Sequence, residues 1–291
     1  MKAKLKRVLK IVLLSIGGLF LIGLLWVGGF IYKARYGFNF YDTDPVELPA
    51  DLSGKTVLLF SKTNGFRHEA AINASIPAFQ RMATENGWKL FTTDDGGVFN
   101  PEQLSKFDVV VWNNTSGKVL NEEQRGFFKE YLLDGGGFVG VHAAGDNSHQ
   151  WEWYESEVIG AVFSHHTMHP QIQKANMYLE EGPKTLTNGL DDVWEREEEW
   201  YMFYQNPRDK GFDVLYTVDE SKMIPGGNIP ILASDKDWGM GEDHPIVWYR
   251  ELGKGKAFYS GLGHQGSAFK ETKYLQLLEN AIIWAGDFDQ E

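Results

Sequence analysis

The segment from Ile11 to Tyr32 contains 22 residues and no charged side chain, and it limits the architecture more than any other feature of the chain. A helix of that length spans about 33 Å, enough to cross the hydrocarbon core of a bilayer. A cleaved secretory signal is the alternative, but its apolar core is only about 7–15 residues long and leads into a small-residue cleavage site. No clear site of that kind follows Tyr32, so we expect an uncleaved anchor.

Basic residues flank this segment on both sides. Five precede it and two follow it closely: Lys2, Lys4, Lys6, Arg7, Lys10, Lys33 and Arg35. Because positive charge marks the cytoplasmic side of a span, the sequence predicts a single-pass membrane protein. Residues 1–10 would be a cytoplasmic tail, 11–32 the anchor, and the later part of the chain periplasmic or extracellular. Residues 33–54 contain two prolines and little apolar periodicity, which predicts a linker that carries the outer domain clear of the lipid headgroups.

The outer part of the chain is acidic. Residues 1–36 hold seven Lys and Arg and no Asp or Glu, so residues 37–291 carry 21 Lys and Arg against 40 Asp and Glu. That balance argues against nucleic acid as a partner. The chain has no cysteine, which excludes disulfides, thiolate metal sites and a cysteine nucleophile. The sequence leaves the oligomeric state open.

Short apolar runs alternate with helical patterns in this outer part. We expect strands at 56–60, 88–92, 108–112 and 138–141, and later at 213–218, 245–249 and 256–260. Helices are expected between them, one ending near Asn86, one beginning near Asn121 and one over 271–284. The alternation predicts one α/β domain with a mostly parallel sheet, whose ligands bind beyond the carboxyl ends of the strands.

His142 stands where the strand expected at 138–141 ends, and small residues flank it in Gly140-Val141-His142-Ala143-Ala144-Gly145-Asp146. A tight turn of this kind is typical of a nucleophile elbow, in which one side chain is raised above the sheet edge. Histidine is a poor covalent nucleophile but a good acid, base or metal ligand. A hydrogen-bonded structural histidine is the alternative, and the small neighbours favour the functional interpretation.

Three more imidazoles lie between residues 165 and 170, at His165, His166 and His169. Neutral imidazole binds zinc and similar divalent metals, so the segment predicts a contribution to a metal site. The HExxH spacing of zinc proteases does not occur in the sequence. Alternatively, one or two of these side chains are simply exposed.

Two further segments suit a sugar. Arg67 and His68 precede an expected helix, whose N-terminus favours anions or sugar oxygens, with a capped helix and a solvated arginine as the equal alternative. Glu199-Trp200-Tyr201 joins a carboxylate to two rings that suit stacking and proton transfer, although a run of acids is more often a solvated face.

Two more histidines lie beside expected strands. His264 follows a strand in Gly261-Leu262-Gly263-His264, where small residues permit a ligand to approach the backbone closely. His244 begins the strand expected at 245–249. We therefore include both histidines among the candidate site residues.

The motifs together resemble the ThuA-like (trehalose-utilisation) family over residues 55–286. They are Gly-Phe-Arg-His at 65–68, the glycine-rich strand and elbow at 135–144, Glu-Trp-Tyr at 199–201, His-Pro-Ile at 244–246 and Phe-Tyr-Ser-Gly-Leu-Gly-His at 258–264. The resemblance implies a flavodoxin-like three-layer sandwich, similar to class I glutamine amidotransferases. That superfamily has a catalytic cysteine at the elbow, where this chain has His142, so glutaminase activity is not implied. The family's short Phe-x-x-His-Pro turn is longer here, and His166 and His169 are both candidates for its histidine.

The resemblance also implies work on carbohydrate, including disaccharides and keto-sugars. One hypothesis is an enzyme that hydrolyses or eliminates a glycoside or keto-sugar, with His142, Glu199 and His68 as catalytic residues. The substrate would be bound by Arg67, Asp146, Trp200, Tyr201, His244 and His264. A divalent metal such as zinc would be held by ligands drawn from His142, His166, His169 and His264. The other hypothesis is a non-catalytic sugar-binding or scaffold domain at the membrane surface.

Overall fold

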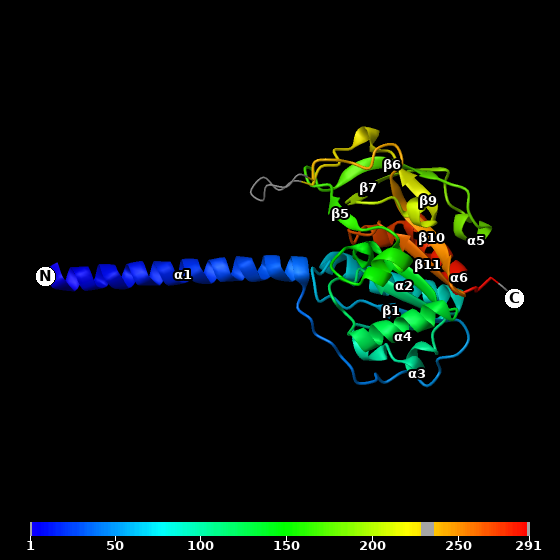
Figure 1. Ribbon diagram of the computed structural model, residues 1–291, viewed down its shortest axis with the longest axis horizontal. Helices are drawn as coiled ribbons and strands as arrows, with labels where there is room; N and C mark the ends of the chain where they lie inside the picture. The colour runs from blue at the N-terminus through cyan, green and yellow to red at the C-terminus, as the bar shows by residue number, and fades with distance from the viewer. Residues whose placement is uncertain (1, 228–235, 290–291) are drawn as a thin grey trace.

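A long N-terminal helix projects from the domain in the computed structural model, which describes residues 2–227 and 236–289 (Figure 1). This helix, α1, covers Lys2–Tyr36. Its part from Lys4 to Lys33 is long and apolar enough to cross a membrane, and none of it is buried against the domain. A core helix is thereby excluded, whereas a signal sequence near the N-terminus would have the same length and composition.

Residues 37–54 lie along the surface of the domain and are not a free spacer. The Phe38 amide donates to the Asn64 carbonyl at 2.8 Å. The Gln103 side chain accepts from the Val46 amide and donates to the Val46 carbonyl. Asp42 forms an ion pair with Lys62. The expectation of a linker that separates the domain from the helix therefore differs from the structure, because polar groups of this segment find partners on the domain.

One nine-stranded sheet forms the centre of the domain. Its order is β2 (Lys89–Thr93), β1 (Thr56–Phe60), β3 (Val109–Asn113), β4 (Gly137–Val141), β11 (Gly255–Ser260), β10 (Pro245–Leu252), β9 (Asp213–Val218), β6 (Gln173–Leu179) and β7 (Val193–Glu198). The first five strands pair in parallel, and the four pairs from β11 to β7 are antiparallel. Strands β10 and β6 consequently run opposite to the other seven. A separate pair joins β5 (Phe163–His166) to β8 (Tyr201–Phe203).

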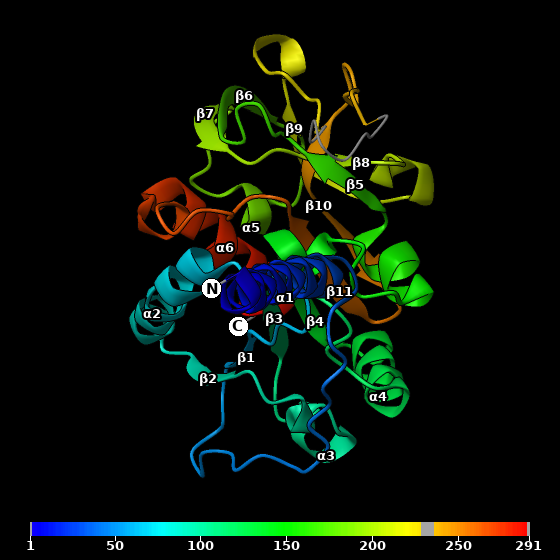
Figure 2. The ribbon, with the colours of Figure 1, turned by 90° about the vertical axis from the view of Figure 1, so that its left-hand side faces the viewer.

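Helices cover both faces of the parallel part (Figure 2). Helices α2 (Glu69–Asn86) and α6 (Thr272–Ala285) lie on one face, and α3 (Pro101–Leu104) and α4 (Glu122–Leu133) lie on the other. A one-turn helix, α5 (Lys184–Thr187), packs on α6. The remaining helical turns are 3₁₀ turns at Gly96–Val98, His142–Gly145, Pro207–Lys210, Glu220–Lys222 and Ala268–Lys270, and a π-helical turn at Tyr154–Ile159. These layers confirm the flavodoxin-like α/β sandwich with a mostly parallel sheet.

The buried strands explain the layers. All residues of β1, β3 and β4 are buried, as expected for parallel strands covered on both faces. Strand β7 is different because its residues alternate between exposed and buried positions along Val-Trp-Glu-Arg-Glu-Glu. This sequence alternates with the period of a strand, but four of its six residues are charged, so a search for apolar runs does not find it.

The direction of the strands places several loops at one edge of the sheet. Strands β1, β4 and β11 are parallel, and β7 points the same way after the two reversals at β10 and β6. The loops that follow these four strands therefore meet at the carboxyl edge, although they are far apart in the sequence. This edge carries the candidate site.

Candidate functional site

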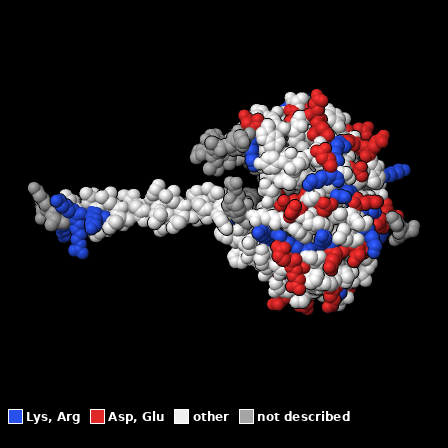
Figure 3. Space-filling model, in the orientation of Figure 1, with Lys and Arg blue, Asp and Glu red and all other residues white. Residues whose placement is uncertain are grey.

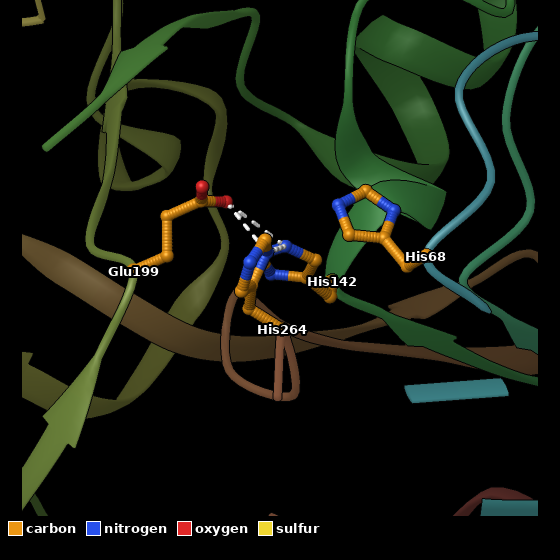
Figure 4. Close-up of side chains that lie close together, drawn as sticks. All are labelled: His68, His142, Glu199 and His264. Carbon is orange, nitrogen blue, oxygen red and sulfur yellow. Dashed lines mark hydrogen bonds and ion pairs between the residues drawn. The ribbon is translucent and has the colours of Figure 1, made fainter. Parts of the chain in front are cut away.

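Four side chains from these four loops meet at the carboxyl edge (Figure 4). They are His68 after β1, His142 after β4, Glu199 after β7 and His264 after β11. One ligand atom of each lies within 4.8 Å of those of the others. Figure 4 shows the Glu199 carboxylate reaching toward His142 and His264, with His68 across from them.

His142 occupies a left-handed backbone conformation directly after β4, with φ at 49°. Such a conformation is strained in a residue with a side chain and is typical of functional turns. The Tyr259 hydroxyl donates to the His142 carbonyl at 2.9 Å and fixes the turn. His142 Nδ1 donates to the Gly261 carbonyl at 2.8 Å. A neutral ring therefore carries its proton on Nδ1 and directs the lone pair of Nε2 into the cluster.

Glu199 is the common partner of the imidazoles, although it is only 2% exposed. Its Oε2 lies 3.2 Å from His142 Nε2 and 3.0 Å from His264 Nδ1. Its Oε1 lies 3.2 Å from His166 Nδ1. Burial alone would raise the pKa of Glu199, but the hydrogen bonds from His142 and His264 outweigh it and hold that pKa well below its ordinary value. The carboxylate is therefore ionised in a largely dry site.

The two remaining histidines differ in their protonation. Burial would lower the pKa of His264, but its hydrogen bond with Glu199 raises that pKa above the ordinary value. Burial lowers the pKa of His68 to about 2, and repulsion from His142 and His264 adds to the effect. Within the described part of the chain, His68 Nδ1 is buried and has no hydrogen-bond partner. His68 is thus a neutral imidazole with an unused polar nitrogen beside the cluster.

The cluster could hold a metal ion. The His142 Nε2, His264 Nδ1 and Glu199 Oε2 atoms form a triangle with sides of 3.0, 3.2 and 3.3 Å. Two ligands of one tetrahedral metal, each about 2.1 Å from it, lie about 3.4 Å apart. Because Nδ1 of His142 is bonded to Gly261, it is Nε2 that faces the carboxylate oxygen, and either a proton or a cation must lie between these two atoms. His68 offers a fourth ligand atom within 4.8 Å of the others, and this donor set suits several divalent metals, zinc among them.

Of the histidines at 165–170, the structure brings His166 to the cluster. His169 is exposed and lies outside the group of four, whereas His166 Nδ1 lies 3.2 Å from Glu199 Oε1. His165 is buried beside the cluster, and its Nε2 lies 3.2 Å from the Pro225 carbonyl and 3.1 Å from the Trp238 carbonyl. The contact with Glu199 favours His166 over His169 for the position that the sequence leaves open.

The two aromatic residues after Glu199 do not offer open ring faces. Trp200 is 0% exposed, and its indole nitrogen donates to the Gln173 carbonyl at 2.7 Å. A stacking platform needs a free face, and Trp200 has none, so the expected stacking role does not fit its burial. Tyr201 is also buried, but its ring centre lies 4.2 Å from that of His142, where it forms a wall of the site.

Three other predicted residues lie outside the cluster. His244 is fully buried, with Nδ1 2.7 Å from a Glu220 carboxylate oxygen and Nε2 2.8 Å from the Tyr201 carbonyl. Both of its nitrogens thus lie close to oxygen atoms of the protein. Arg67 pairs with Glu69 at 2.7 Å. Asp146 accepts from the Ser148 amide at 2.8 Å, and burial raises its pKa. These contacts favour structural roles for all three side chains.

Glu198 and Arg196 are supporting residues that the sequence analysis missed. Glu198 accepts hydrogen bonds from the amides of Gly263 at 2.9 Å and His264 at 3.3 Å, so it fixes the loop that carries His264. Arg196 pairs with Glu198 at 2.9 Å, and both side chains are buried. The period-two pattern of β7 is the signal that could have found them, because it turns Arg196 and Glu198 inward and their neighbours outward.

The sequence of this domain matches the model of a known protein family. Residues 56–285 match the family model described as ThuA, trehalose utilisation. The chain belongs to the ThuA family. Its name connects this ThuA domain with carbohydrate.

Solved structures of ThuA-like proteins share this fold. A ThuA-like protein from Bacteroides uniformis has 24% sequence identity and a TM-score of 0.65, over 86% of this chain and 95% of its own. A second, from Parabacteroides merdae, has 18% identity and a TM-score of 0.58, over 80% of this chain and 90% of its own. At these identities the likeness concerns the fold alone. The comparison with curated proteins finds no match.

Proposed function

We propose that this ThuA protein is a membrane-anchored enzyme that hydrolyses or eliminates a glycoside or keto-sugar at the cluster of His68, His142, Glu199 and His264. The observation that carries the proposal is the convergence of these side chains, from four loops, on one point of the carboxyl edge. Ionisable groups concentrated in this way, with a strained residue at the centre, are typical of active sites. The family name supports carbohydrate as the substrate class.

The cluster would hold a divalent metal through His142, His264 and Glu199, with His68 as a further donor. When bound, such an ion polarises a sugar carbonyl or a water molecule. The Gly261 carbonyl fixes the tautomer of His142, and Glu198 holds the backbone of His264 in place.

Proton transfer would fall to His166. Its side chain is 30% exposed and in contact with Glu199, so it has access both to solvent and to the cluster. In an elimination, the neutral imidazole accepts the proton from the carbon beside the keto group. The electrons of that C–H bond form a double bond as the glycosidic C–O bond breaks, and the imidazolium returns its proton to the leaving oxygen.

The alternative of a sugar-binding domain without catalysis has less support. Its two expected stacking rings, Trp200 and Tyr201, are buried. A binding module needs neither a strained histidine nor a cluster of buried ionisable groups. The alternative therefore predicts that saccharide binding survives the loss of the cluster.

The test uses the full chain purified in detergent. We expect bound divalent metal by elemental analysis, and turnover of glycosides or 3-keto-glycosides that a chelator abolishes. The variant Glu199→Gln should lose both properties. The matched control is Glu220→Gln, which alters a part-buried carboxylate that also pairs with a histidine and should keep both. Absence of metal and of turnover over a broad panel would contradict the proposal, and saccharide binding that persists in Glu199→Gln would favour the alternative.

We also propose that α1 is an uncleaved anchor, with its N-terminus in the cytoplasm and the ThuA domain outside. The basic residues at the far end of α1 support this orientation (Figure 3). Because the chain lacks cysteine, a single Val193→Cys variant reports the side of the membrane. It should react with a membrane-impermeant thiol reagent in intact bacterial cells, or in spheroplasts where an outer membrane is present. Labelling only after lysis would contradict the orientation.

A further inference from the structure

Almost no chain separates the apolar helix from the ThuA domain. The uncharged run ends at Tyr32, and Gly37 is already buried against the domain. Gly37 has φ at 72°, and a Cβ at this position would lie 2.8 Å from the Asn64 carbonyl oxygen, so a glycine is needed for this close approach. The four residues between them are helical and extend about 6 Å along the helix axis. A domain joined to a membrane helix in this way lies at the membrane surface.

The domain is joined to α1 through its carboxyl edge. Asn64 binds the chain that leaves α1 twice, through the Phe38 amide at 2.8 Å and the Phe40 carbonyl at 3.0 Å. Asn64 lies in the loop after β1, four residues before His68 of the cluster. Four residues span at most about 14 Å. The end of α1 and the candidate active site are therefore neighbours on the same edge, and Figures 1 and 2 show α1 leaving the domain at this side.

Exposed aromatic side chains surround this junction. Phe38, Phe40 and Phe66 are 42%, 68% and 42% exposed. The backbones of Phe38 and Phe40 are held by Asn64, and the Phe66 ring lies 4.9 Å from that of His68. Aromatic side chains at the end of a membrane helix are typical of the interface between lipid and water.

We propose that the carboxyl edge of the domain rests on the membrane that holds α1, with Phe38, Phe40 and Phe66 in the interface and the cluster opening toward the lipid headgroups. This inference rests on the proposed anchor, but not on the chemistry of the cluster. The occupant is a lipid surface, because the short connection to α1 holds this edge of the domain beside the membrane that α1 crosses. Nothing comparable holds a protein partner at this edge. The substrate then reaches the cluster from the headgroup layer.

The test places single nitroxide labels on the full chain, in vesicles of phosphatidylcholine with one quarter phosphatidylglycerol. The variants Phe40→Cys and Phe66→Cys carry labels at the proposed interface. Val193→Cys is the matched control, because Val193 is 51% exposed and lies at the other end of β7, about 20 Å from Glu199. Collisions with dissolved oxygen and with a polar nickel chelate are measured for each label. Unchanged metal content in the three variants shows that the cluster is intact.

We expect the labels at positions 40 and 66 to have an oxygen-to-nickel collision ratio several-fold higher than the label at 193. Equal ratios at all three positions, in a chain that floats with the vesicles and resists alkaline extraction, would overturn the docking and leave the anchor in place. A chain that does not float would overturn both. Absence of metal or of turnover in the unlabelled parent protein would contradict the proposed chemistry and would not bear on the docking.

Discussion

The buried Glu199 and the part-buried Glu220 of this ThuA domain both face histidines, and their surroundings differ in one respect. Glu220 lies 2.7 Å from His244 Nδ1, and His244 Nε2 is occupied by the Tyr201 carbonyl, so the pair is closed by the protein itself. Glu199 faces three imidazoles, and His68 beside them has a buried nitrogen with no partner among the described residues. Both sites combine burial with opposite charge. Glu220 thus has one histidine partner, whereas several imidazoles converge on Glu199, and that convergence is the arrangement that can bind a ligand.

The strongest test of this comparison is Glu199→Gln. We expect metal affinity to fall about 100-fold or more, because the carboxylate is an anionic ligand that an amide replaces poorly. Turnover should fall to background, whereas the fold is retained because the amide has nearly the same shape. Elemental analysis, competition with a chelating dye and rate measurements check these expectations. Retained metal affinity would remove Glu199 from the ligand set.

Glu220→Gln should affect stability instead. His244 is fully buried and Glu220 Oε1 lies 2.7 Å from its Nδ1, so loss of the carboxylate weakens this contact and we expect the free energy of unfolding to fall by about 2–3 kcal/mol. Glu220 accepts a hydrogen bond from the backbone N–H of Met240 at 2.6 Å, and the side-chain oxygen of the Glu220→Gln variant can still accept it. Denaturant titration of the full chain in detergent measures the change. Lost metal with unchanged stability would reverse the assignment of the two carboxylates.

The sequence predicts the parallel half and much of the site, for physical reasons. Buried parallel strands such as Val109–Asn113 are apolar runs, and polar residues directly after them must lie at one edge. This reasoning locates His142, His68 and His264 at that edge. The antiparallel half is harder to predict because one face of β6 and one face of β7 are polar. In addition, the sequence of a strand does not indicate which distant strand it pairs with.

The expected stacking role of Trp200 is wrong for a related reason, which is that the sequence alone does not show which way a side chain points. Trp200 follows Glu199 directly, but neighbouring residues of an extended chain point in opposite directions. Glu199 therefore faces the cluster while Trp200 enters the core. Likewise, whether His166 or His169 meets Glu199 depends on the pairing of β5 with β8, which places His166 opposite Tyr201. The sequence alone does not contain that register.

Glu198→Gln should lower metal affinity less than Glu199→Gln does, and more than Glu220→Gln does. Glu198 binds the amides of Gly263 and His264, so the variant weakens the support of one ligand without removing any. We expect metal affinity to fall about 10-fold, as for other residues that orient ligands. A chelator competition series compares it with Glu199→Gln. An equal loss in the two variants would indicate that Glu198 contacts the metal itself.

The comparison also predicts a dependence of stability on pH. Burial opposes ionisation of Glu220, but the hydrogen bond from His244 outweighs it and lowers its pKa below the ordinary value of 4.5. A carboxylate with a lowered folded-state pKa stabilises the protein above its unfolded-state pKa, and this contribution is lost as the pH falls through the folded-state value. The stability difference between the parent and Glu220→Gln should therefore be constant near neutral pH and shrink below about pH 4.5. Unfolding curves at several pH values check this, and a difference that grows on acidification would contradict it.

The smallest effect is expected for Trp200→Phe. The substitution removes the hydrogen bond to the Gln173 carbonyl and part of a buried ring, so we expect a loss of about 1–2 kcal/mol in the free energy of unfolding. Because the ring has no exposed face, the KM for a saccharide substrate should be unchanged. A variant with normal stability and a raised KM would show that Trp200 contacts the sugar after all. Since Trp200 adjoins Glu199 in the chain, this result would mean that the loop rearranges when substrate binds.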